Sequence, residues 1–254
     1  MRQMLIAGNW KMHKTLKDAV NLASRIVDWA SQTKPRSQVA ICPPFPFLES
    51  ISRLLNGSMV GLGAQNCHYE NEGAYTGEVS PPMLKSVGCD FVIIGHSERR
   101  TYFQENDELI NKKILSALNF DLRPIFCIGE TLSEREKNLT FEVIERQIRK
   151  GLEKVTTWQA EKIFVAYEPV WAIGTGISAK TEQIDDAHRF IRNLLVEMFN
   201  ERGQKIAILY GGSLNSKNAR EIFSLPEVNG GLIGKSSLDS EEFTKIVDFA
   251  EESI

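Results

Sequence analysis

The residues of this 254-residue chain that could do chemistry stand directly after short apolar runs. Asn9 and Lys11 follow the first run, His96 follows the fourth and Glu168 follows the sixth. A carboxylate can remove a proton from carbon, while an imidazole, an amide and an ammonium can stabilise the oxygens that become negative as an enediolate forms. This set of side chains predicts a general-base reaction beside a carbonyl group, with Glu168 as the base.

His96 precedes a plausible helix start, Ser97-Glu98-Arg99-Arg100. The positive end of such a helix favours the neutral imidazole, which is a suitable hydrogen-bond donor to an enediolate. Taken alone, a histidine in this place is more often structural, and Glu98 with Arg99 is most simply an ion pair that holds a loop. The functional interpretation therefore depends on whether these side chains meet Lys11 and Glu168 in one cavity.

The segment after Glu168 has the composition of a hinged, apolar lid. It consists of Pro169, Val170, Trp171, Ala172, Ile173, Gly174, Thr175 and Gly176. Large apolar side chains in a loop are costly to expose, at roughly 1.5–3 kcal/mol each. We therefore expect this segment to cover the base; the alternative is that Glu168 belongs to a structural network beneath a packed loop.

Glycine-rich segments follow the last two apolar runs. Gly211, Gly212 and Gly234 can bring backbone N–H groups, together with those of Ser213 and Lys235, to an anion at a helix N-terminus. A single turn of this kind is weak evidence. Two of them after the last two strands of a barrel would predict a phosphate site.

Eight short apolar runs recur along the chain, and they start 20 to 43 residues apart, which leaves room for a helix after each. The runs span residues 4–8, 39–42, 59–64, 91–95, 125–129, 163–167, 206–210 and 232–234. Helix starts are expected at Thr15 and Asn106. Eight β-then-α units predict an α/β fold, a closed (β/α)8 barrel of eight parallel strands ringed by helices.

No linker or shift in composition divides the chain, so we expect a single domain over residues 1–254. A doubly wound open sheet is the competing fold, but no GxGxxG motif follows the first run. At the carboxyl ends of barrel strands, side chains face a common mouth, which is where the candidate residues would converge.

Composition argues against several function classes. The net charge is −3 and no run of Lys and Arg reaches five residues, so a nucleic-acid partner is not expected. The four cysteines form no CxxC pair and the four histidines no HExxH motif, which argues against a metal site and a disulfide framework. No stretch has the length of a signal peptide's apolar core or a membrane span. We expect a cytoplasmic protein with no membrane partner.

These residues occur in motifs that resemble the triosephosphate isomerase family over essentially the whole chain. The motifs lie at residues 8–12, 63–66, 76–80, 95–100, 127–130, 166–176, 210–213 and 230–238. The resemblance implies a TIM barrel that interconverts dihydroxyacetone phosphate and D-glyceraldehyde 3-phosphate via an enediolate, in glycolysis and gluconeogenesis. It also implies that the reaction needs no cofactor and no metal.

By the same resemblance, the residues around the reacting carbons take definite roles. Glu168 is the base and His96 is the electrophile. Asn9 and Lys11 bind the substrate, and Glu98 lies beside the site as an acid paired with Lys11.

The resemblance also assigns the phosphate site and the lid. Main-chain N–H groups of Gly174, Ser213, Gly234 and Lys235 hold the phosphate of the triose substrate. Tyr210 and Ser213 latch the lid when it closes.

Residues 71–78 resemble the projecting loop of the family, which inserts into a partner subunit near its first-strand lysine. Read without the family, the segment is a polar surface loop. With the family, Tyr75 and Thr76 belong to a dimer loop and the chain is expected to form a homodimer.

The chain departs from the usual family pattern at several positions. Lys235 stands where a second glycine is common, and Asn229 where Asp is frequent. His13, Tyr75 and Ile177 also differ from the usual residues. A lysine at residue 235 keeps its N–H, so phosphate binding survives unless this position requires a positive φ.

Two other functions remain open. A Schiff-base aldolase on the same barrel would need a lysine at the end of the sixth strand, where this chain has Glu168. A barrel that has lost its activity and acts as a binding protein is the second alternative. The complete set of Asn9, Lys11, His96 and Glu168 speaks against it.

Overall fold

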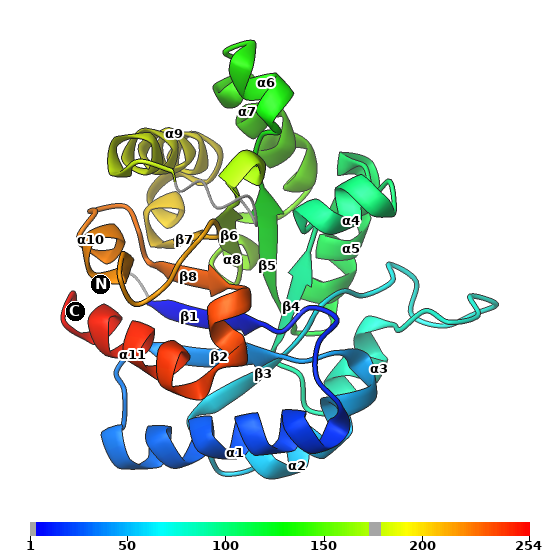
Figure 1. Ribbon diagram of the computed structural model, residues 1–254. Helices are drawn as coiled ribbons and strands as arrows, with labels where there is room; N and C mark the ends of the chain where they lie inside the picture. The colour runs from blue at the N-terminus through cyan, green and yellow to red at the C-terminus, as the bar shows by residue number, and fades with distance from the viewer. Residues whose placement is uncertain (1–3, 173–178) are drawn as a thin grey trace.

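A computed structural model describes residues 4–172 and 179–254 of the chain. Within these residues, eight parallel strands close into a barrel in which each strand pairs with its sequence neighbours and β8 pairs with β1 (Figure 1). The strands are β1 (Leu5–Asn9), β2 (Gln38–Cys42), β3 (Val60–Ala64), β4 (Phe91–Ile94), β5 (Arg123–Ile128), β6 (Phe164–Tyr167), β7 (Ala207–Tyr210) and β8 (Gly230–Ile233). The predicted (β/α)8 barrel is therefore confirmed.

Helices surround the barrel and cover its outer face (Figure 1). They are α1 (Leu16–Thr33), α2 (Leu48–Leu55), α3 (Pro81–Ser86), α4 (Ser97–Tyr102), α5 (Asp107–Asn119), α6 (Leu132–Glu136), α7 (Thr140–Gly151), α8 (Thr157–Ala160), α9 (Thr181–Phe199), α10 (Ala219–Phe223) and α11 (Ser240–Glu251). The expected helix starts are confirmed, because Thr15 caps α1 through the Asp18 N–H and Asn106 caps α5 through the Leu109 N–H. Each cap satisfies a backbone donor that the first helical turn leaves without a partner.

The strands bury both faces, which is why they read as apolar runs and not as alternating patterns. In β1, Leu5 and Ala7 join the cluster that fills the barrel, while Ile6 joins the larger cluster between barrel and helices. Successive side chains of a strand point to opposite faces, so each strand contributes to both cores. Nonpolar burial on both sides fixes the strand ends that carry the site.

Strand boundaries differ from the predicted runs by at most two residues. The two largest differences are at the starts of β5, at Arg123, and of β8, at Gly230. Neither residue is apolar, so hydrophobic patterning misses both.

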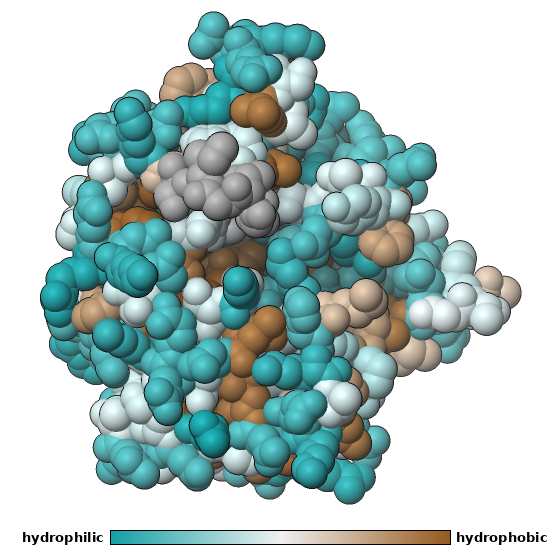
Figure 2. Space-filling view, in the orientation of Figure 1, coloured by the Kyte–Doolittle hydropathy of each residue, from teal (hydrophilic) through white to brown (hydrophobic). Residues whose placement is uncertain are grey.

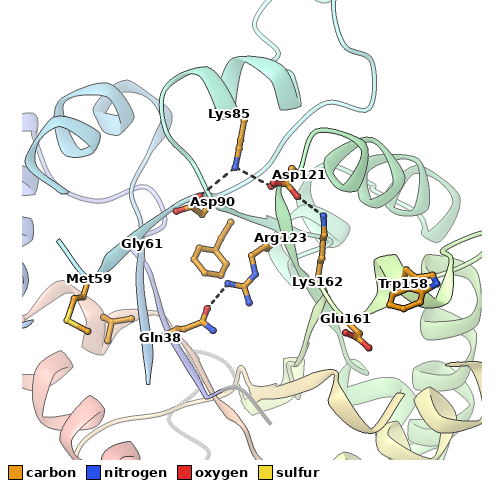
Figure 3. A pocket seen from close by; sticks show the side chains of 12 residues that line it. Gln38, Met59, Gly61, Lys85, Asp90, Asp121, Arg123, Trp158, Glu161 and Lys162 are labelled. Atoms are coloured by element: carbon orange, nitrogen blue, oxygen red, sulfur yellow. Dashed lines mark hydrogen bonds and ion pairs between the residues drawn. The ribbon is translucent and has the colours of Figure 1, made fainter. Parts of the chain in front are cut away.

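The amino end of the barrel is closed by an aromatic and ionic layer (Figure 3). The Arg123 guanidinium carbon lies 4.9 Å from the ring centre of Phe91 and 4.7 Å from that of Phe164, and Nη1 donates to Gln38 at 2.6 Å. Burial lowers the pKa of Arg123, an effect that the charge of Asp90 opposes. Arg123, the first residue of β5, thus makes cation–π contacts with the aromatic rings at the amino end of the barrel.

Around Arg123, a cavity of about 610 Å³ is bordered by ion pairs. Lys85 lies 3.6 Å from Asp90, and Lys162 lies 2.6 Å from Asp121 (Figure 3). These pairs stand at the amino ends of strands, the end of such barrels where residues usually serve stability.

None of the helices in the described part of the chain is long and apolar enough to span a membrane.

Candidate active site

A cavity of about 560 Å³ lies at the carboxyl ends of the strands, opposite the ionic layer. It is lined by Asn9, Lys11, His96, Glu168, Gly211, Gly212, Ser213, Leu214, Asn215, Leu232, Gly234, Lys235 and Ser236. The structure therefore brings together the residues that sequence analysis collected from strands one, four, six, seven and eight.

Glu168 is the first residue after β6 and is held deep in this cavity. Its side chain is 2% exposed, and its backbone N–H donates to the Ile128 carbonyl at 2.7 Å. Oε1 lies 3.1 Å from His96 Nε2, and Oε2 accepts the backbone N–H of Ser97 at 2.9 Å. A buried carboxylate is stable only with such donors, and here both come from the turn after β4.

His96 caps α4, as expected for a residue before a helix start. Its Nδ1 accepts the backbone N–H of Glu98 at 3.2 Å. A nitrogen that accepts a hydrogen bond carries no proton, so this bond assigns the neutral tautomer with the proton on Nε2. Nε2 then points its N–H at the Glu168 carboxylate and the cavity.

Asn9 and Lys11 enter the cavity from the end of β1. Asn9 is buried, and its Oδ1 accepts the Lys11 N–H at 3.0 Å. Lys11 has a φ of 49°, an uncommon conformation for a residue with a side chain, and its Nζ lies 2.6 Å from Glu98 Oε1. The predicted pairing of Lys11 with Glu98 is present.

Gln65 holds the Lys11 loop, a role that sequence analysis did not assign. Its Nε2 donates to the Lys11 carbonyl at 2.9 Å and to the Cys42 carbonyl at 2.8 Å. Gln65 directly follows β3, so the rule that identified Asn9 and His96, a polar residue after an apolar run, could have identified it too.

Residues of both glycine-rich turns line the same cavity as His96. Ser213 and Gly234 border the cavity, and Lys235 begins a 3-10 turn over Lys235–Leu238. Lys235 is absent from the described residues with positive φ, so this position does not need glycine for its backbone conformation. The departure at residue 235 is compatible with an exposed backbone N–H.

Gly211 does not have the anion-binding role that sequence analysis predicted for it. Its N–H donates to the Tyr167 carbonyl at 2.7 Å and does not serve as an anion donor in this arrangement. A Cβ at this position would lie 2.8 Å from Glu168 Cγ. Glycine is needed here because the Glu168 side chain passes directly against the backbone.

The described part of the predicted lid, Pro169 to Ala172, includes a 3-10 turn over Val170–Ala172. Ile173, Gly174, Thr175 and Gly176 lie outside the described residues. Trp171 Nε1 donates to Glu130 Oε1 at 2.8 Å, and the fully buried Glu130 also accepts the Tyr167 hydroxyl and pairs with Arg135. Sequence analysis gave Glu130 no role, because the Tyr167 and Trp171 side chains that donate to it are 37 and 41 residues away in the chain.

Tyr210, the predicted latch, ends β7 with its ring buried. Its hydroxyl has no hydrogen-bond partner among the described residues. Burial raises the pKa of Tyr210, so the hydroxyl keeps its proton and remains a donor.

Comparisons with known proteins agree with this geometry. A family model described as triosephosphate isomerase matches residues 4–250. The chain is 47% identical over 252 residues to the triosephosphate isomerase of Chloroherpeton thalassium, which covers 99% of this chain and 100% of that protein. It is 50% identical over 248 residues to that of Carboxydothermus hydrogenoformans, at 97% and 98% coverage.

A solved structure gives the same result. The crystal structure of triosephosphate isomerase from Bartonella henselae matches with a TM-score of 0.89 and 39% identity, covering 97% of this chain and 98% of that chain. The resemblance deduced from the motifs is thus confirmed at the level of sequence and of fold: the chain belongs to the triosephosphate isomerase family.

Proposed function

We propose that Glu168 and His96 carry out the proton transfers that interconvert dihydroxyacetone phosphate and D-glyceraldehyde 3-phosphate. Family membership gives the reaction, and the assignment of residues is our inference. One observation carries it: Glu168 Oε1 and His96 Nε2 lie 3.1 Å apart in one cavity, which residues of the glycine-rich turns also line.

In this mechanism the Glu168 carboxylate removes a proton from the carbon next to the substrate carbonyl. The Nε2–H of neutral His96 donates to the carbonyl oxygen as it gains negative charge, which lowers the energy of the enediolate. The carboxylic acid then returns the proton to the neighbouring carbon. The hydroxyl proton of the substrate passes to the former carbonyl oxygen through His96 Nε2, which gives its own proton to one oxygen and takes one from the other, so that carbonyl and hydroxyl exchange places. The hydrogen bond from the Glu98 N–H to His96 Nδ1 supports this role, because it fixes the proton on the nitrogen that faces the cavity.

Lys11 and Asn9 bind the substrate oxygens. The Lys11 ammonium supplies positive charge beside the developing enediolate, and its pairing with Glu98 keeps it at the cavity wall. Glu98 therefore acts on the reaction through Lys11.

The phosphate is held by the N–H groups of Ser213, Gly234 and Lys235 together with that of Gly174. The first three border the cavity, and Gly174 belongs to the lid residues outside the described part of the chain. In the same proposal, the lid from Pro169 to Gly176 closes over the bound substrate and is latched by Tyr210 and Ser213. Closure excludes water from the enediolate.

The chain forms a homodimer in our proposal. Residues 71–78, between β3 and α3, project from the barrel, and apolar surface surrounds the base of this projection (Figures 1 and 2). Met12 and Phe103, which lie after β1 and α4, are 94% and 62% exposed, and both line a cavity of about 670 Å³. Such exposed apolar surface beside a projecting loop is typical of a protein interface, and a second copy would insert Tyr75 and Thr76 there.

We further propose that the chain is a single domain over residues 1–254 that works in the cytoplasm. One barrel extends from β1 to α11 and includes nearly all described residues, which supports the domain assignment.

An isomerase assay coupled to a dehydrogenase tests the reaction in each direction, and turnover is expected without added metal or cofactor. Borohydride treatment in the presence of substrate tests the aldolase alternative. We expect no covalent adduct; an adduct on Lys11 or Lys235 would contradict the proposal, as would the absence of isomerase activity.

A further inference from the structure

The pairing of β4 with β5 stops before the strands reach the active site. Ile94 and Phe126 are the last residues in register, and His96 lies two residues beyond Ile94. The turn that carries His96 and Ser97 therefore extends past the end of the strand ladder. Both residues contact the Glu168 carboxylate, so the position of this turn sets the geometry of the base.

The Arg100 guanidinium, on α4, bridges the two strand ends beyond the ladder. Its Nε donates to the Gly95 carbonyl at 2.9 Å, and its Nη2 donates to the Cys127 carbonyl at 3.1 Å. Gly95 is the residue directly before His96. One planar guanidinium thus links the end of β4 to the end of β5.

A third contact fixes the guanidinium itself. Nη1 donates to Asp107 Oδ1 at 2.7 Å, and Asp107 Oδ2 lies 3.2 Å from Arg146 Nε on α7. The Arg100 side chain is 17% exposed and that of Asp107 9%. Charge-assisted hydrogen bonds in such a place are short and directional, so every nitrogen of Arg100 has a defined partner.

We infer that Arg100 is a positioning residue for the isomerase reaction, which acts by fixing the turn Gly95–Ser97 against the end of β5. The inference rests on the proposed roles of Glu168 and His96. A lysine keeps the charge but cannot reach two carbonyls and a carboxylate at once. Displacement of a catalytic group by about 1 Å can cost roughly 100-fold in rate.

The Arg100 side chain borders a second cavity, which makes a chemical rescue experiment possible. A cavity of about 440 Å³ between α4, α5 and α7 is lined by Arg100, Asp107 and Arg146, on the outer side of the turn. Removing the Arg100 side chain would open this cavity toward the Gly95 and Cys127 carbonyls. A small guanidinium ion in solution could then occupy the vacated position.

Arg100→Lys and Arg100→Ala test the inference, with Arg146→Ala as the matched control. Arg146 shares Asp107 with Arg100 but does not bond either strand end in the described structure. We expect kcat to fall roughly 10- to 100-fold in both Arg100 variants, with KM and inhibition by inorganic phosphate nearly unchanged because the phosphate turns lie after β7 and β8. Arg146→Ala should keep its kcat.

Ethylguanidinium provides the readout that a purely structural role would not give. It should restore part of kcat in Arg100→Ala and have no such effect on Arg146→Ala. If Arg100→Ala does not fold, Arg100→Lys carries the same kcat-against-KM test. Wild-type kcat in Arg100→Lys would overturn the inference, and so would a loss confined to KM.

A failure of the proposed function can be distinguished from a failure of the positioning role. An inactive wild-type protein would refute the isomerase mechanism itself, whereas an active wild type with equally active Arg100 variants would refute only the positioning role.

Discussion

At the scale of single residues, the site depends on the tautomer and the side-chain orientation that two backbone contacts select. The Glu98 N–H makes His96 Nδ1 an acceptor, and the Ser97 N–H orients one oxygen of Glu168 while the other faces His96. Two successive N–H groups at the start of α4 thus set both the tautomer of His96, the proposed electrophile, and the orientation of Glu168, the proposed base. Electrostatic groups that are already oriented need no reorganisation during the reaction.

Replacing Glu168 by Gln tests the base. Glutamine keeps the shape of the side chain but cannot accept a proton from carbon, so we expect kcat to fall by roughly 10²–10⁴. Inhibition by inorganic phosphate should stay close to that of the wild type, since the phosphate turns are untouched. Near-normal turnover in the isomerase assay would mean that another group acts as the base.

Sequence reasoning found polar residues that converge on the cavity and missed the contacts that Gln65 and Glu130 make with distant segments. Asn9, His96 and Glu168 each follow an apolar run, so their convergence follows from the barrel alone. Gln65 and Glu130 act on Lys11 and Trp171, which are 54 and 41 residues away. Both residues directly follow an apolar run, so the same rule would have marked them as candidates, but only the folded chain shows which distant group each one contacts.

At the scale of elements, α9 is joined to the amino end of β8 by a buried ionic network. Arg192 is 4% exposed, its Nε lies 2.9 Å from Glu227 Oε2, and its Nη2 donates to Asn229 Oδ1 at 3.2 Å. Asn229 Oδ1 also accepts the Ile208 N–H of β7. The departure from Asp at residue 229 therefore keeps the acceptor, while Glu227 supplies the negative charge that balances Arg192.

Glu227→Gln should destabilise the fold, because it removes a carboxylate that pairs with the buried Arg192. We expect the free energy of unfolding to fall by roughly 1–3 kcal/mol, the usual cost of removing one partner of a buried polar pair. Urea unfolding measures this, with Glu252→Gln as the control. Glu252 pairs with Arg220 at the surface, where such pairs contribute little. Equal stabilities of the two variants would contradict the network's role.

At the scale of the whole molecule, the two ends of the barrel are built differently. The carboxyl end holds the site and the projecting loop, and the amino end is closed by Arg123 and its aromatic and ionic neighbours (Figure 3). Sequence analysis predicted the closed barrel because eight buried strands repeat at helix-sized intervals. The pairing of β1 with β8, which closes the barrel, could not be predicted from a local pattern, because the two strands are at opposite ends of the chain.

Thr76→Arg tests the proposed homodimer. Thr76 is exposed in the single subunit, so the arginine should leave the fold intact, but it would be buried against a second copy. Sedimentation should give twice the 28.6 kDa chain mass for the wild type and a shift toward one chain for the variant. Met59→Glu, at the amino end of the barrel, is the control and should remain dimeric. A wild type that sediments as one chain would refute the dimer.

The stability of the molecule should depend on pH through His188, a fully buried histidine on α9. Burial lowers its pKa to about 4, from 6.5 in the unfolded chain, although Nδ1–H donates to the Glu227 carbonyl at 3.1 Å, which favours the charged ring. Arg192, Glu227 and Asp185 are the charged groups that act on it. The neutral ring packs edge-on against Tyr167, with ring centres 6.0 Å apart.

Between about pH 6.5 and pH 4, the unfolded chain binds a proton at this site that the folded chain does not. Stability from His188 is therefore complete above pH 6.5 and decreases as the pH falls, by about 3 kcal/mol at most for this shift. His188→Asn keeps a donor near Nδ1 but cannot titrate. The difference in unfolding free energy between wild type and variant should shrink on acidification over this range, and parallel curves would show that the folded protein accommodates a charged His188.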